Sequence, residues 1–179
     1  MHGVIFSSLR DFVTSGYGRD AAEELFAGEP SYLHTEAYPD ERLVALVSRA
    51  AAMTGADEGA IVHDFGVFAA QRTFTRLYPA FYAIAGSARE FLLTFETRIH
   101  ELVRATIPNA VPPRLTVTPL GEEGVEILYD SPRQLCVLLR GLIEGTAAHY
   151  GESLTIDEPA CMHKGDDACR FQVRSASPG

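Results

Sequence analysis

Apolar side chains recur at three- and four-residue spacing in four runs of the first 106 residues, the pattern of helices with one buried face. Glycine and proline mark where these runs start and stop. Pro39, for example, suits the first position of a helix because its ring presets φ and it has no N–H to satisfy. The pattern predicts four helices, over about residues 5–13, 39–54, 58–77 and 88–106.

Beyond Pro108 the apolar residues alternate with polar ones, which is the period of a strand. Two hairpins are expected, each with a polar or glycine-containing turn between its strands. Their four strands are predicted at 114–118, 125–129, 153–156 and 168–173.

A further helix is predicted between the two hairpins. Ser131 suits a helix cap, Pro132 the first helical position, and Gln134 the position three residues after the cap. The helix is expected to run from Ser131 to about Tyr150. The fold class is therefore α+β, with helices packed at one end and an antiparallel sheet at the other.

Composition limits the classes of protein to consider. The chain has 179 residues, 46% of them apolar, enough to bury the core of one domain over residues 1–179. It has no run of about 18 apolar residues and no secretion signal, so we expect a cytoplasmic protein. A formal net charge of -9 disfavours nucleic-acid partners and anionic membranes, since both would repel the chain. Three cysteines, an odd number, favour free or metal-bound thiols over a disulfide framework.

His100 is the first side chain that could carry chemistry. It lies eight residues after Leu92 and three before Val103, so it borders the apolar stripe of the predicted 88–106 helix. A neutral imidazole facing an apolar slot is a standard axial ligand of haem iron. The same position also suits a structural histidine at the edge of a core.

Tyr129, Ser131 and Arg133 form a second candidate group. In an extended segment, residues two apart point to the same side, so a phenol, a hydroxyl and a guanidinium could converge on one ligand. Haem has two carboxylates, and arginine suits them because it can donate two parallel hydrogen bonds. A helix starting at Ser131 would add backbone amides. The alternative is that Ser131 only caps the helix, Tyr129 only packs, and Arg133 forms a surface pair.

The order of these residues resembles the H-NOX family of haem nitric oxide/oxygen binding domains. The motif is Tyr129-x-Ser131-x-Arg133, preceded by His100 and by the pair Pro112-Pro113. The resemblance extends over nearly the whole chain, through Met1-His2-Gly3, Tyr78-Pro79 and Gly141-Leu142-Ile143-Glu144-Gly145.

The resemblance implies a bacterial, stand-alone member of the family that binds haem b. It implies about seven helices, mostly N-terminal, packed with a four-stranded antiparallel sheet. His100 would ligate the iron, and Tyr129, Ser131 and Arg133 would hold the propionates. Pro113 would contact the haem and distort it.

The resemblance also bears on which gas is bound. Oxygen-binding members carry a distal tyrosine on the helix after the propionate motif, whereas this chain has Leu138 at the matching place. Ile5 and Leu9 would keep the rest of that wall apolar, so nitric oxide and carbon monoxide are the expected ligands. Tyr78 or Tyr82 could still supply a hydroxyl from another helix.

By the same resemblance, nitric oxide would bind ferrous haem, weaken or break the bond to His100, and shift the helix and haem relative to the sheet. The sequence ends at Gly179 without an effector, so we expect the signal to pass to a separate partner. That partner would be a histidine kinase, or an enzyme of cyclic-di-GMP or another cyclic nucleotide. No phosphate-binding loop or catalytic triad is visible, and we expect no catalysis.

The three cysteines form another candidate site. Cys161 and Cys169 flank the turn of the second hairpin, and Cys136 lies on the preceding helix. Tetrahedral zinc needs a fourth ligand, for which His163 is nearest by type and Glu158 is another candidate. The spacing resembles a zinc site of some bacterial H-NOX proteins, which typically have a histidine where this chain has Glu158. The thiols could instead be buried apolar groups or a redox-sensing cluster.

Two functions from different classes therefore remain. One is the haem-based gas sensor, and the other is a haem-free module on the same fold that binds a small molecule or senses zinc or redox state. The remaining histidines have no matching constellation and are expected at the surface or its boundary. They are His2, His34, His63 and His149.

Overall fold

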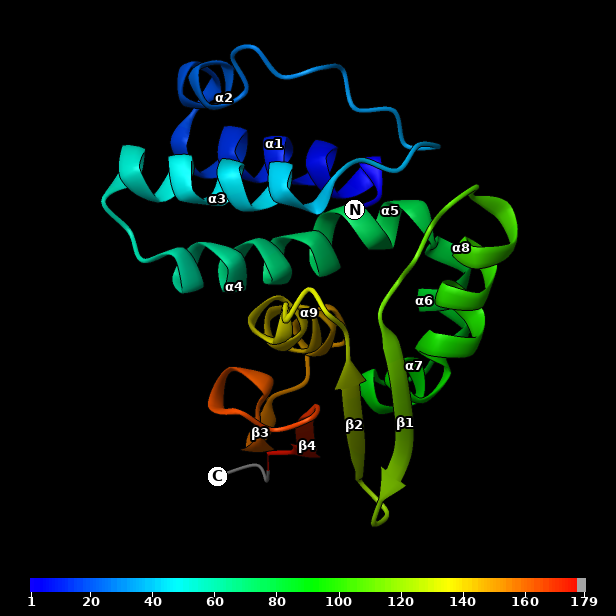
Figure 1. Ribbon diagram of the computed structural model, residues 1–179. Helices are drawn as coiled ribbons and strands as arrows, with labels where there is room; N and C mark the ends of the chain where they lie inside the picture. Colours follow the sequence, from blue (N-terminus) through cyan, green and yellow to red (C-terminus); the bar gives the residue numbers. More distant parts are fainter. Residues whose placement is uncertain (177–179) are drawn as a thin grey trace.

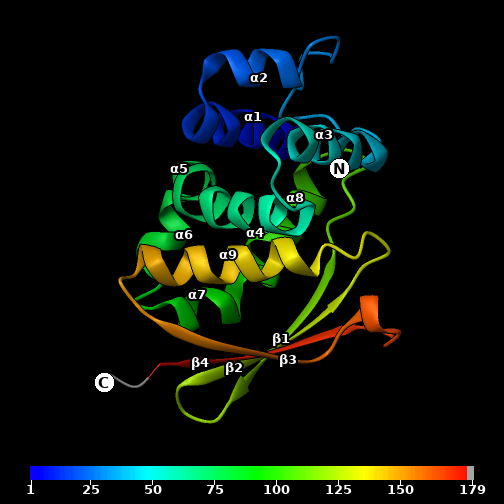
Figure 2. The ribbon, with the colours of Figure 1, turned by 90° about the vertical axis from the view of Figure 1, so that its left-hand side faces the viewer.

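The computed structural model describes residues 1–176, so the last three residues of the expected 1–179 domain lie outside the described part. Helices are stacked in layers above one sheet (Figures 1 and 2). From the layer farthest from the sheet these are α2 (Arg19–Leu25), α1 (Gly3–Tyr17) with α3 (Asp40–Thr54), α4 (Glu58–Phe68), and α9 (Cys136–His149). One buried apolar cluster fills the space among the first four helices, and a second lies between α9 and the sheet.

Two long helices contain π-helical segments. The first runs through α4, η1 (Ala69–Phe74) and α5 (Thr75–Leu77), and the second through α7 (Ala88–Phe95), η2 (Glu96–His100) and α8 (Glu101–Thr106). Both match the helices expected over 58–77 and 88–106. With each counted as one helix and α6 (Pro79–Ile84) added, the described residues contain seven α-type helices, as expected.

The shorter helices depart from the sequence prediction. α2 and α6 were not predicted because, at seven and six residues, each is too short to show a helical period. Pro79, which limits the preceding helix, is also the first residue of α6. Pro39 precedes its helix as the N-cap, so that helix begins at Asp40 instead of Pro39.

The sheet has four antiparallel strands in the order β1-β2-β4-β3. The α+β fold class and both hairpins are thereby confirmed, although the strands are longer than predicted. The strands are β1 (Arg114–Leu120), β2 (Gly124–Asp130), β3 (Leu154–Ala160) and β4 (Cys169–Ser175). The central pairing of β2 with β4 places Tyr129 opposite Cys169.

The helix predicted to start at Ser131 begins instead at Cys136. Ser131 and the next three residues form a turn, in which the Gln134 N–H donates to the Ser131 carbonyl at 3.1 Å. Gln134 has a φ of 50°, a left-handed conformation that interrupts a right-handed helix. The cap and proline signals are real local preferences, but here they shape a turn before the helix.

Glycines bring α4 and α9 into backbone contact. A Cβ on Gly141 would lie 2.1 Å from the His63 carbonyl oxygen, and one on Gly66 would lie 2.5 Å from the Leu138 carbonyl oxygen. Gly145 repeats the pattern with 2.5 Å to the Val67 carbonyl oxygen. Any larger residue here must push the helices apart.

Within the described residues, no helix combines the length and apolar character needed to cross a membrane.

Candidate functional site

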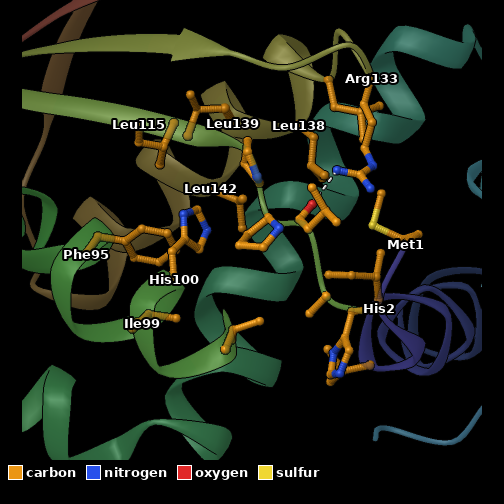
Figure 3. A pocket seen from close by; sticks show the side chains of 18 of the residues that line it. Met1, His2, Phe95, Ile99, His100, Leu115, Arg133, Leu138, Leu139 and Leu142 are labelled. Carbon is orange, nitrogen blue, oxygen red and sulfur yellow. Dashed lines mark hydrogen bonds between the residues drawn. The ribbon is translucent and has the colours of Figure 1, made fainter. Parts of the chain in front are cut away.

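A mainly apolar cavity of about 180 Å³ lies where the start of α1, the two π-containing helices, the first hairpin and α9 meet (Figure 3). Seven of the nine residues predicted for a haem site line it, although they come from five separate parts of the chain. They are Ile5, Tyr78, His100, Pro113, Tyr129, Arg133 and Leu138. Leu9 and Ser131 are fully buried but are not among the lining residues.

His100 lies at one side of this cavity, where two neighbouring residues contact its ring (Figure 3). Its Nδ1 lies 2.6 Å from Oε2 of Glu96, and its ring meets the Phe95 ring edge-on at 4.8 Å between centroids. Burial lowers the pKa of His100 although Glu96 opposes this, which favours the neutral imidazole that binds metals. Among residues 1–176, Nε2 has no hydrogen-bond partner, so it is the nitrogen available to a ligand in the cavity.

The π-helical segment η2 sets the direction of His100. The Glu101 N–H donates to the Glu96 carbonyl, a bond that spans five residues instead of four. Sequence reasoning placed His100 on a helix but missed both this segment and Glu96. The available signal was the four-residue spacing of Glu96 and His100, which puts them on one helix face.

Arg133 lies across the cavity from His100 (Figure 3). Its Nε donates to Oδ2 of Asp40 at 2.7 Å, and an NH group donates to the Val111 carbonyl at 2.6 Å. Burial would raise the pKa of Asp40, but the N-terminal amine and Arg133 hold it below its usual value. The guanidinium is therefore anchored at the cavity with donors suited to a carboxylate.

Tyr129 and Ser131 differ in what they do. Tyr129 lines the cavity, and its hydroxyl accepts a hydrogen bond from the Leu135 N–H at 3.0 Å. The Ser131 hydroxyl accepts a hydrogen bond from the Arg133 N–H at 3.3 Å, which stabilises the turn before α9. Of the three side chains predicted to converge on one ligand, Tyr129 and Arg133 line the same cavity, whereas Ser131 bonds to the backbone that presents Arg133.

The sequence left open whether Tyr78 or Tyr82 reaches the cavity, and the structure distinguishes them. Tyr78 lines the cavity, and burial raises its pKa, so its phenol stays protonated. Tyr82 lies outside the cavity lining and its hydroxyl donates to the Ala70 carbonyl at 3.2 Å. Ile5 and Leu138 add apolar groups to the wall, while Leu9 packs in the core instead.

His2 is a cavity residue that the sequence did not single out. It was expected at the surface or its boundary, yet it lines the cavity together with Met1 (Figure 3). Its Nε2 is buried and has no hydrogen-bond partner among residues 1–176. Burial lowers the pKa of His2, and the neighbouring charges of His34 and the N-terminal amine lower it further.

The cysteine cluster forms between the start of α9 and the sheet. Potential ligand atoms of Cys136, Glu158, Cys161 and Cys169 all lie within 4.8 Å of one another. The sulfur of Cys161 is 3.8 Å from that of Cys136 and 3.9 Å from that of Cys169. Burial and the adjacent thiols raise the pKa of Cys136, so without a cation it stays protonated.

The fourth group of this cluster is Glu158, and His163 lies apart from it. His163 Nε2 donates to the Gln134 carbonyl at 2.8 Å. Glu158 Oε1 is buried and has no hydrogen-bond partner among the described residues. A carboxylate and three thiols at this spacing are a donor set suited to tetrahedral zinc. Residue type favoured His163 in the sequence analysis, but the alternation along β3 turns Glu158 inward.

Comparison with known proteins places the chain in a family. The family model HNOB, described as Haem-NO-binding, matches residues 2–158. Soluble guanylate cyclases 89Da and 89Db of Drosophila melanogaster are 26% and 25% identical over 74% and 87% of this chain. The chain spans only 20% and 24% of the length of these two relatives.

Solved structures show the same fold. An H-NOX protein from S. oneidensis in the Fe(II)NO ligation state aligns with a TM-score of 0.91 at 24% identity, over 99% of this chain and 100% of that one. An unliganded Fe(II) H-NOX protein from K. algicida aligns with a TM-score of 0.85 at 20% identity, over 99% and 98% of the two chains. With the family model covering most of the sequence, the chain belongs to the Haem-NO-binding, or H-NOX, family.

Proposed function

We propose that this protein is a haem-based gas sensor, with His100 as the iron ligand. The observation that supports this most strongly is the placement of a buried, neutral imidazole and an anchored guanidinium on the same apolar cavity. Haem needs these two features: an axial nitrogen for its iron and cationic donors for its carboxylates. The family membership agrees with this chemistry.

The remaining residues of the site would contact different parts of the haem. Arg133 and Tyr129 would donate to the propionates, with Ser131 holding the turn between them. Pro113 would contact the ring and distort it, since it lines the same cavity. Haem supplies the iron to which a diatomic gas binds, whereas this chain positions it and excludes water.

Nitric oxide is the proposed signal, and carbon monoxide is a second ligand. Leu138 and Ile5 give the cavity wall apolar groups where a hydrogen-bond donor would favour bound oxygen. Tyr78 also lines the cavity and carries a hydroxyl that could donate to bound oxygen, so the spectrum in air tests the proposed gas preference.

A change in the bonding of His100 would act on the continuous helix of α7, η2 and α8, because His100 is part of its backbone. We infer that this helix passes the signal to a separate effector and that the domain itself has no catalytic role. The effector would be a histidine kinase or a nucleotide cyclase. The curated relatives are named as guanylate cyclases, which agrees with a cyclase-type output.

The test is the absorption spectrum of the haem-supplied, reduced protein before and after nitric oxide, and then in air. We expect a five-coordinate ferrous spectrum that nitric oxide converts to a five-coordinate nitrosyl spectrum, with no stable oxygen complex. A stable oxygen complex would contradict the proposed gas preference and point to Tyr78. Absence of any haem band would overturn the sensor and favour a haem-free module that binds another small molecule.

The cysteine cluster supports a second role, zinc binding or thiol-based redox sensing. Glu158 Oε1 is buried without a partner beside three thiols, and an unpaired carboxylate there is costly unless a cation joins it. We infer that Cys136, Cys161, Cys169 and Glu158 bind zinc, and that His163 takes no part.

Removing the carboxylate should weaken this metal site. Glu158→Ala is expected to lower zinc affinity by more than the roughly 10–100-fold that loss of an outer-shell partner costs. His163→Ala is the matched control and should leave affinity unchanged. Zinc competition and the thiolate-to-cobalt absorption of the Co(II)-substituted protein measure both. If the wild type binds neither metal and its thiols oxidise together, the cluster is a redox site without a metal.

A further inference from the structure

Glu96 connects the candidate iron ligand to two other elements. Its Oε2 is 2.6 Å from Nδ1 of His100, and its Oε1 accepts from an NH group of Arg104 at 2.7 Å. Arg104 also donates to the Pro113 carbonyl at 3.2 Å. Both carboxylate oxygens are therefore used, and the network joins the His100 helix to the segment that enters β1.

The carboxylate determines which nitrogen of His100 has the proton. An ionised carboxylate can only accept hydrogen bonds, and Oε1 of Glu96 already accepts one from Arg104. Nδ1 must then be the protonated nitrogen, which leaves the lone pair on Nε2. Nε2 is the nitrogen without a protein partner in the described residues, on a side chain that lines the cavity.

The backbone holds this pair in place. Glu96 and His100 are the first and last residues of η2, and the five-residue bond from the Glu101 N–H closes that turn. Phe95 limits rotation of the imidazole by packing against its edge. The Glu96 side chain is only 21% exposed, so water screens the interaction weakly.

We propose that Glu96 is a positioning residue that fixes the tautomer of His100 and makes its Nε2 a stronger donor to the haem iron. A carboxylate that accepts from the far ring nitrogen orients a metal-bound histidine and raises its basicity. The proposal has two parts. The first, the tautomer of His100, depends only on this chain. The second, the stronger bond to iron, rests on the proposed function.

The first half is tested on haem-free protein. ¹⁵N–¹H correlation NMR should show His100 of the wild type protonated at Nδ1 and bare at Nε2. Glu96→Gln should keep this tautomer because its amide oxygen still accepts, whereas Glu96→Ala should shift His100 toward the Nε2–H form. An Nε2–H tautomer in the wild type, or no difference in Glu96→Ala, would overturn the proposal.

The second half is tested on haem-loaded protein by resonance Raman spectroscopy. The iron–histidine stretching frequency should fall in Glu96→Gln, which keeps the hydrogen bond but loses the charge, and fall further in Glu96→Ala. Haem dissociation should be about 10–100-fold faster in Glu96→Ala. Glu101→Ala, a change at an exposed neighbour on the same helix, should match the wild type.

The outcomes separate this proposal from the proposed function. If the wild type shows an iron–histidine band that Glu96→Gln and Glu96→Ala leave unchanged, Glu96 has no positioning role although the sensor proposal stands. If the wild type shows the expected tautomer but takes up no haem, the sensor proposal fails and the role of Glu96 in orienting His100 stands. Unfolding midpoints equal to the wild type show that the variants are folded.

Discussion

His100→Gly is expected to lose haem during purification while remaining folded. The substitution removes the one ring nitrogen that the structure leaves available at this side of the cavity. Losing an outer-shell partner of a metal ligand costs about 10–100-fold in affinity, so losing the ligand itself should cost more. The measurement is haem content by pyridine haemochrome, together with the ferrous absorption spectrum.

Added imidazole provides a sharper form of this test. A free imidazole can occupy the space left by the side chain, so it should restore a ferrous haem spectrum to His100→Gly. The matched control is His34→Gly, a change in an exposed loop, which should retain haem. If His100→Gly keeps its haem and its spectrum without imidazole, the iron has another ligand, and His2 is then the first residue to examine.

Gly141→Ala is expected to destabilise the protein by about 3 kcal/mol or more, the upper end of overpacking effects. The added methyl would lie 2.1 Å from the His63 carbonyl oxygen, which belongs to backbone and has no room to rotate away. Alanine is otherwise the better helix former by about 1 kcal/mol, so the clash must outweigh that gain. Urea unfolding should show a lower midpoint with an unchanged slope.

The same substitution at Gly16 should have the opposite sign. Gly16 is in the last turn of α1, and a Cβ there would meet nothing within 4 Å. Gly16→Ala should therefore stabilise the protein by about 0.5–1 kcal/mol. If Gly141→Ala proved as stable as Gly16→Ala, the close approach of α4 and α9 would be wrong.

Features with a local cause were predictable from the sequence. The stripe of apolar residues around His100 depends on a helical period, and each hairpin depends on alternation and its own turn. The family motif identified Tyr129 and Arg133, and the structure brings both to the cavity. These residues are recognisable from the sequence because residues two apart in an extended segment point to the same side.

Features that depend on contacts between distant segments were not predictable. The predicted start of α9 was wrong because Gln134 adopts a left-handed conformation, and the long-range contact at this residue comes from His163, whose Nε2 donates to the Gln134 carbonyl at 2.8 Å. The pairing of β2 with β4 and the inward turn of Glu158 follow from the sheet as a whole. His2 enters the cavity wall because the first turn of α1 lies against it.

The glycine contact between α4 and α9 also has a mechanical consequence. Where side chains separate two helices, changes of rotamer can absorb a small displacement of one helix against the other. At Gly66 and Gly141 the backbones of α4 and α9 are in direct contact, so no side chain is available to adjust. A displacement of α9 beside Leu138 should therefore move α4 with it, and the two helices should move as one rigid unit between the cavity and the outer helical layers.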